Sequence, residues 1–212
     1  MTTRETREED ASGREASEIP RQIIVVDCET TGLDAWHYPV EVAWWNLATD
    51  QRGCFVPPHE RWLFGADPQA LACNRYEQRI AHRVVDADYT AATVLAQQLA
   101  GNILAGSAPA FDAGMLRRLF VTCQGAREGG RHAAWRDPWH HRLLDLAAYT
   151  AGAVGLDPAR LPGLDRVCQL LGVDYDPEAA HGAEHDVTAT GRCFRALIRH
   201  DDTGEGATDG RG

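Results

Sequence analysis

The stretch Ile23-Ile24-Val25-Val26-Asp27-Cys28-Glu29-Thr30-Thr31-Gly32-Leu33 decides the fold. Its four leading β-branched residues predict a buried strand over residues 22–28. Asp27 and Glu29 end this strand, and residues two apart on a strand point to the same face. Two carboxylates this close repel each other unless a cation lies between them, and Mg²⁺ and Mn²⁺ prefer such oxygen ligands. Because an Asp-x-Glu after an apolar run is common without a metal, the rest of the chain has to decide.

Composition points to one soluble globular domain. The chain has 212 residues, of which 44% are hydrophobic and 25% charged, which suffices for a core of ordinary size. It contains no apolar run of the roughly 18 residues that a membrane span needs, and no apolar leader. From that we expect no membrane contact. The six cysteines form no Cys-x-x-Cys pair, which gives little support for a zinc site, and we expect reduced thiols in a cytoplasmic protein.

The net charge of −10 at first argues against a nucleic-acid partner. Residues 1–20 and 201–212 each carry −3, and we expect both to be disordered tails around one domain at residues 21–200. Residues 117–142 instead hold six arginines against two acids. That Arg-rich segment either guides a nucleic-acid strand or is a solvated loop without a role.

The hydrophobic periodicity predicts a mixed α/β architecture. We expect strands over residues 22–28, 39–47, 53–56, 103–106 and 141–146. We expect one helix from Asp67-Pro68 through residue 76, one opening at Phe111-Asp112, and a long loop over residues 123–139. Further helices are expected over residues 90–100, 147–154, 161–171 and 184–200. Early strands with short turns, followed by alternating strands and helices, predict a mixed sheet flanked by helices.

Two more acids lie where active sites of such folds gather. Asp112 follows a short buried strand, and Asp186 lies at the start of the last helix, five residues after His181. Because sites in α/β folds form at the carboxyl ends of strands and at helix starts, we expect Asp112 and Asp186 to converge with Asp27 and Glu29.

These motifs, in this order, resemble the three exonuclease motifs of the DEDDh group. This is the DnaQ-like family of 3′–5′ exonucleases, which includes the proofreading subunit of bacterial replicative polymerase and ribonuclease T. The resemblance covers about residues 22–200 and implies a ribonuclease H-like fold with a five-stranded mixed sheet. It implies release of nucleoside 5′-monophosphates from single-stranded DNA or RNA 3′ ends, with DNA favoured.

The resemblance also implies residue roles. Asp27, Glu29, Asp112 and Asp186 would hold two Mg²⁺ or Mn²⁺ ions, and His181 would be the general base that activates water. Four residues would bind the terminal nucleotide: Thr30, Thr31, Leu33 and Phe111. Leu33 would wedge against its base, whereas Phe111 could be a base platform or, as we favour, a core residue.

Two positions, Ala108 and Asp145, and the function of the chain each allow more than one interpretation. The family often has Asn where this chain has Ala108, and Ser107 or the Pro109 turn could substitute for that amide. Asp145 is a fifth acid, which we expect to cap a helix or support the site rather than bind metal. Competing functions are an inactive nucleic-acid-binding or scaffold module, an RNA-trimming exoribonuclease, and a phosphodiesterase of small nucleotides. No motif indicates a polymerase partner.

Overall fold

The computed structural model describes residues 20–58, 60–86, 89–127 and 136–202. The two predicted tails lie outside these residues, except that residues 20, 201 and 202 are described. Part of the Arg-rich segment, residues 128–135, also lies outside.

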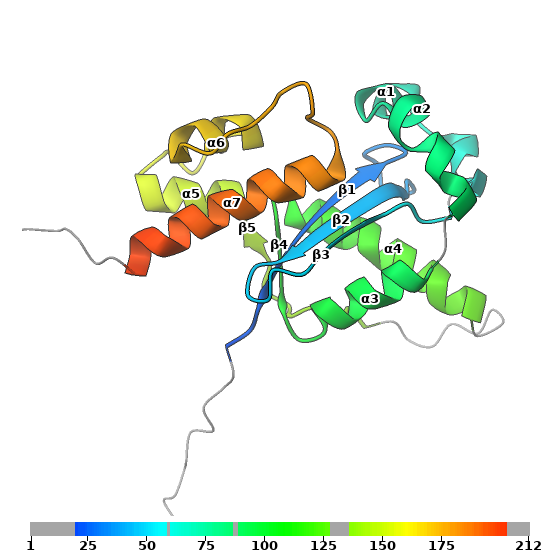
Figure 1. Ribbon diagram of the computed structural model, residues 1–212, viewed down its shortest axis with the longest axis horizontal. Coiled ribbons are helices and arrows are strands. Elements are labelled where there is room, and N and C mark those ends of the chain that lie inside the picture. Colours follow the sequence, from blue (N-terminus) through cyan, green and yellow to red (C-terminus); the bar gives the residue numbers. More distant parts are fainter. Residues whose placement is uncertain (1–19, 59, 87–88, 128–135, 203–212) are drawn as a thin grey trace, which may run out of the picture.

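A five-stranded mixed sheet organises the molecule, as predicted (Figure 1). Its strands are β1 (Ile23–Thr30), β2 (Pro39–Asn46), β3 (Arg52–Phe55), β4 (Ile103–Gly106) and β5 (Leu144–Asp145), in the order β3-β2-β1-β4-β5. The first three strands are antiparallel neighbours, whereas β4 runs parallel to β1 and β5 parallel to β4. The carboxyl ends of β1, β4 and β5 therefore lie at one edge of the sheet.

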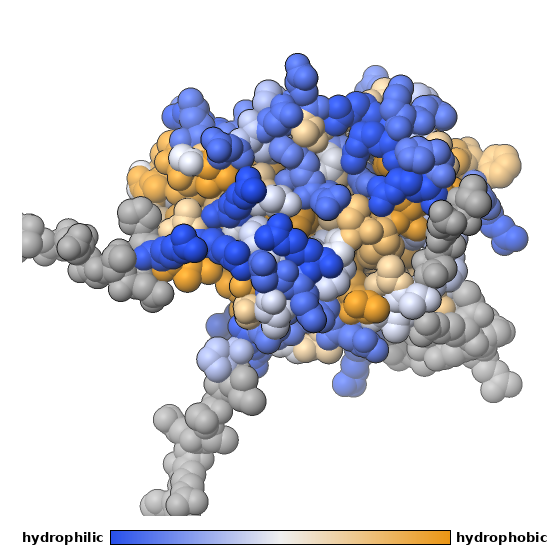
Figure 2. All heavy atoms as spheres, viewed as in Figure 1, coloured by the Kyte–Doolittle hydropathy of each residue, from blue (hydrophilic) through white to orange (hydrophobic). Residues whose placement is uncertain are grey.

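Helices cover both faces of the sheet. α5 (Leu146–Val154), α6 (Leu164–Leu171) and α7 (Ala183–Asp202) lie on one face, and α3 (Thr90–Leu99) and α4 (Pro109–Arg127) on the other. Successive β1 residues alternate between the two cores: Val25 packs in the layer of α6 and α7, and Val26 in the layer of α3 and α4. Figure 2 shows hydrophilic side chains over the side of α7 that faces away from the sheet.

The segment between β3 and α3 differs from the prediction. It holds two 3₁₀ helices, η1 (Glu60–Gly65) and η2 (Ala81–Asp86), and two short α-helices, α1 (Pro68–Cys73) and α2 (Tyr76–Arg79). The predicted Asp67 cap is confirmed, since its carboxylate accepts from the Gln69 amide at 2.8 Å. The single helix predicted through residue 76 is wrong, because Arg75 takes a left-handed φ of 53° and separates the two helices.

Three other elements also differ from their predicted bounds. α4 begins at Pro109 rather than at Phe111, because proline is well suited to the first helical position. It extends to Arg127, into the predicted loop. β5 has two residues instead of six, and it ends at Asp145 because that residue is also the N-cap of α5. α6 begins at Leu164, after Gly163, instead of at residue 161.

Among the described residues, no helix combines the length and apolar character that crossing a membrane requires.

Candidate active site

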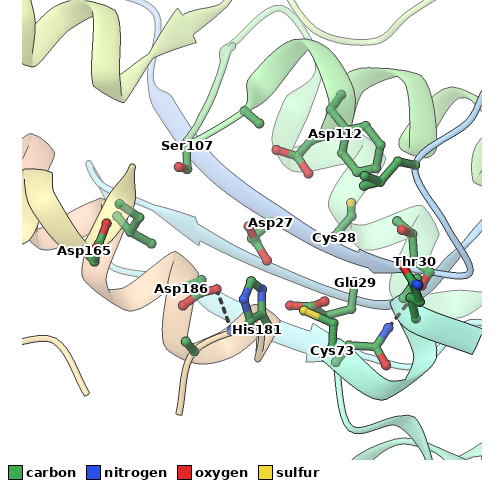
Figure 3. Close-up of a pocket in the computed structure, with 18 of the residues that line it drawn as sticks. Asp27, Cys28, Glu29, Thr30, Cys73, Ser107, Asp112, Asp165, His181 and Asp186 are labelled. Carbon is green, nitrogen blue, oxygen red and sulfur yellow. Dashed lines mark hydrogen bonds between the residues drawn. The ribbon is translucent and has the colours of Figure 1, made fainter. Parts of the chain in front are cut away.

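One cleft, of about 770 Å³, contains all five residues predicted to carry the chemistry. They are Asp27, Glu29, Asp112, His181 and Asp186 (Figure 3). The acids come from β1, α4 and α7, and His181 lies just before α7. Convergence of the four acids at the carboxyl end of β1 therefore agrees with the expectation from their places in the chain.

β1 supplies two acids to the same side. Asp27 and Glu29 both line the cleft, and Cys28 between them lies mostly in the core under α4 while also contributing to the cleft wall. The register with β2 places Glu29 directly opposite Glu41. Three carboxylates are thereby concentrated on two neighbouring strands.

Asp112 enters the cleft from the first turn of α4. Its side chain is buried at 2% exposure, and its Oδ2 has no hydrogen-bond partner among the described residues. A Cβ at Gly106, the last residue of β4, would come within 3.1 Å of this oxygen and within 2.9 Å of the Val26 carbonyl oxygen. Glycine at this position therefore lets β4 pass close to the carboxylate.

The Asp186 carboxylate accepts hydrogen bonds from the backbone of His181 and from the side chain of Tyr175. The backbone N–H of His181 donates to Asp186 Oδ2 at 3.1 Å, and the Tyr175 hydroxyl donates to Oδ1 at 3.1 Å. His181 is exposed, and its backbone has a left-handed φ of 58°. Its imidazole lies between Asp186 and Glu29 (Figure 3).

Crowding and burial disfavour negative charge on all four acids. Burial, then the charges of Asp112 and Glu29, raise the pKa of Asp27 well above its ordinary value. Burial raises the pKa of Glu29 to about 7, with the Asp186 charge adding to the effect. Burial raises the pKa of Asp112 to about 8, against opposing contacts with Cys28. Burial also raises that of Asp186, although hydrogen bonds from Tyr175 and His181 oppose the rise.

The donor set fits a divalent cation. A cation among these carboxylates would relieve their repulsion and give the unpartnered Asp112 Oδ2 a partner. Ligand atoms of Glu29, His181 and Asp186 already lie within 4.8 Å of one another. Hard carboxylate oxygens suit Mg²⁺ or Mn²⁺, and the imidazole within this group widens the choice to metals that accept nitrogen.

The predicted nucleotide-binding residues separate into two groups. Thr30, Leu33 and Phe111 line the cleft, with Leu33 80% exposed and Phe111 partly packed against the core. Thr31 is not among the lining residues and is buried. Its hydroxyl contacts His37 Nδ1 and accepts from the Tyr38 amide, both at 3.1 Å, so it holds the loop after β1.

The structure gives the surroundings of Ala108 and Asp145, the two positions with alternative interpretations. Ala108 and Ser107 both line the cleft, and the Ala108 carbonyl accepts from the Asp112 amide in the first turn of α4. Asp145 is confirmed as a helix cap, because its carboxylate accepts from the Ala148 amide at 2.8 Å. It is not among the residues that line the cleft.

Sequence reasoning missed residues that support the acids. Tyr175 was not singled out, although its hydroxyl bonds Asp186. Asn74 is buried in the cleft wall and donates through Nδ2 to the Thr30 carbonyl oxygen at 3.0 Å. Glu41 is 2% exposed and pairs with Arg79 and Arg83. A single acid within the apolar strand β2 was the one local signal of this arrangement.

Comparison with known proteins defines the class. The family model described as Exonuclease (RNase_T) matches residues 24–194, which includes all five residues of the cleft. The chain therefore belongs to this exonuclease family and is a 3′–5′ exonuclease, a hydrolase that acts on nucleic acids.

Particular relatives agree with this class. Ribonuclease T of Salmonella typhimurium is 25% identical over 191 residues, covering 82% of this chain and 83% of the relative. Ribonuclease T of Escherichia coli K12 is 26% identical over 193 residues, with the same coverage. A zinc-bound E. coli exonuclease I–single-stranded DNA complex superimposes with a TM-score of 0.61 at 17% identity, covering 87% of this chain. This chain spans only 41% of that exonuclease I chain, so the likeness shows the fold.

Proposed function

We propose that this protein removes nucleotides one at a time from single-stranded 3′ ends, with DNA favoured, and releases nucleoside 5′-monophosphates. The observation that carries the proposal is the convergence of Asp27, Glu29, Asp112, His181 and Asp186 in one cleft. The exonuclease I structures solved with single-stranded DNA oligonucleotides support such a substrate. We propose one domain over residues 21–200 as the catalytic unit.

In this proposal the four carboxylates hold two Mg²⁺ or Mn²⁺ ions. When bound, the ions would stabilise the attacking and leaving oxygens of an in-line displacement at phosphorus. The chain's own part is to hold the four acids close together around the end of β1, a strand that is fixed by pairing on both sides. The fixed strand places the ligands before substrate binds, so little reorganisation is needed.

His181 is the proposed general base. Its imidazole is exposed and reaches the same space as Glu29 and Asp186, where it can accept a proton from the attacking water. Thr30 and Leu33 line the route to the acids. We propose that the exposed Leu33 packs against the terminal base and that Phe111, which packs partly against the core, is mainly a core residue.

A second candidate is an exoribonuclease, which the ribonuclease T relatives favour. The two candidates differ in whether the cleft tolerates or requires a 2′-hydroxyl. Digestion of end-labelled single- and double-stranded DNA and RNA, with Mn²⁺ or with a chelator, separates them. The proposal predicts metal-dependent shortening of single-stranded DNA from its 3′ end. Degradation of RNA alone would favour the second candidate, and equal activity in excess chelator would refute both.

A further inference from the structure

The segment that carries His181 has no regular secondary structure, and residues from other elements form hydrogen bonds with its backbone. Residues 177–182 connect to α7 through turns and bends. A left-handed φ is unfavourable for a residue that carries a side chain, and His181 has a φ of 58°. The segment therefore depends on other contacts to keep His181 in this position.

Two arginines of the α2 region bind the carbonyl groups of this segment. Arg75 donates through Nη1 to the Glu178 carbonyl oxygen and through Nη2 to that of Ala180 at 3.1 Å. Arg79 donates through Nη1 to the His181 carbonyl oxygen at 2.7 Å. Three of the four carbonyl groups from residue 178 to residue 181 thus accept from guanidinium groups.

Arg79 is itself fixed by two further partners. Its Nη1 also donates to the Asn74 carbonyl oxygen at 2.9 Å, and its Nη2 pairs with Glu41 Oε2 at 2.7 Å. The side chain of Asn74 reaches the Thr30 carbonyl oxygen, at the end of β1. One guanidinium therefore connects β2, the wall of the cleft and the backbone of His181.

The residues at the start of α7 lie close to both Glu41 and the Arg79 guanidinium. Glu41 Oε2 also accepts from the Ala183 amide at 3.2 Å, in the first turn of α7. A Cβ at Gly182 would come within 2.8 Å of Arg79 Nη2, so a side chain at this position would displace the guanidinium. Gly182, the residue between His181 and α7, therefore leaves room for the Arg79 guanidinium.

We propose that Arg79, assisted by Arg75, is a positioning residue that holds His181 over the acids for the reaction. The inference rests on the proposed function of His181 and extends it to two residues that do not line the cleft. A guanidinium suits this task because its donors form a rigid planar fork, whereas a lysine ammonium is a point charge on a flexible stem.

Arg83 offers a matched control. It pairs with the other oxygen of Glu41, Oε1, and comes from the neighbouring 3₁₀ helix η2. Arg79→Met and Arg83→Met each remove one cation from Glu41, but only the first removes the contact with His181. We expect similar losses of melting temperature in the two variants. If the two losses of melting temperature differ, Arg79→Met is compared with Arg79→Lys, which retains the positive charge.

We expect Arg79→Met to lower kcat about 10- to 100-fold with little change in KM, since misplacement by 1 Å can cost about 10²-fold. Arg83→Met should stay within about threefold of wild type, a loss too small to reflect misplacement on that scale. We expect Arg79→Lys to remain slow. Wild-type activity in Arg79→Lys would show that the positive charge beside Glu41, rather than the geometry of the fork, sets the rate, and would overturn the proposal.

A double variant tests whether Arg79 acts through His181. In the His181→Ala background, Arg79→Met should cause almost no further loss of kcat, because groups that act as a unit are non-additive. The same fold-loss in both backgrounds would overturn the proposal.

Amide hydrogen exchange over residues 178–183 of the metal-free protein needs no activity. Faster exchange in Arg79→Met than in Arg83→Met supports the proposal, and equal exchange in the two contradicts it. The measurement therefore separates a failure of this inference from a failure of the proposed nuclease function.

Discussion

Glu29→Gln should stabilise the metal-free protein while it removes a ligand from the proposed metal site. Glu29 is partly buried, lies opposite Glu41 across the β1–β2 pair, and shares the cleft with Asp186. Burial, then the charges of Asp186 and Glu41, raise its pKa from 4.5 to about 7. Ionised Glu29 is therefore a source of instability in the absence of a cation, and a neutral amide of the same shape removes it.

The size and the pH window of the effect follow from this pKa. One pH unit between the folded and unfolded pKa is worth about 1.4 kcal/mol, so the rise corresponds to on the order of 3 kcal/mol. Because the folded state holds its proton more tightly, the stabilising contribution of protonated Glu29 is complete below pH 4.5 and is lost as pH rises through about 7. The advantage of the Gln variant should thus be small near pH 4.5 and largest above pH 7.

Thermal unfolding in chelator at several pH values measures this advantage. For a domain of this size 1 kcal/mol shifts the melting temperature by about 2–4 °C, so the variant should gain up to about 6–12 °C at pH 8. Glu77→Gln, at an exposed position on α2, should show no such gain. Adding Mn²⁺ should stabilise the wild type more than the variant. A metal-free Glu29→Gln that is no more stable than wild type at pH 8 would refute the reasoning.

Three further predictions concern the reaction and its substrate. Asp27→Asn and Asp112→Asn should each nearly abolish hydrolysis, and the double variant should be scarcely worse; losses that simply multiply would contradict a shared metal site. His181→Ala should lower the single-turnover rate about 10²- to 10⁴-fold and remove a pH-dependent step, with His185→Ala near wild type; the reverse pattern would reassign the base. The third prediction concerns three arginines of the Arg-rich segment, Arg127, Arg131 and Arg136. Neutralising them should weaken binding of single-stranded DNA and flatten its salt dependence, whereas an unchanged slope would indicate a solvated loop.

His185 shows why the choice between the two histidines needed both kinds of information. The sequence spacing to Asp186 and the 100° rotation between helical neighbours predict that His185 points away from the acids. In the structure it is not among the residues that line the cleft, and its ring lies 4.9 Å from that of Tyr175. The placement agrees with the prediction, while the role of His181 rests on the kinetic test.

The sequence alone determined the elements whose signals are local. β1 and its two acids could be predicted because β-branched residues and a period of two act within a few residues. The caps at Asp67 and Asp145 could be predicted because a carboxylate reaches an amide two or three residues ahead. A mixed sheet flanked by helices followed from the order of these elements along the chain, and the resemblance to the exonuclease family implied that the sheet has five strands.

The tertiary structure alone decided the contacts that place the site's histidine. Arg79 meets Glu41 across 38 residues and the His181 carbonyl oxygen across 102 residues of sequence. Glu41 stands out locally as an acid within the apolar strand β2, but no nearby residue indicates that it pairs with Arg79 or that Arg79 contacts His181. Their pairing arises because burying Glu41 requires cations, and only the folded chain brings α2, β2 and the start of α7 close enough to supply them.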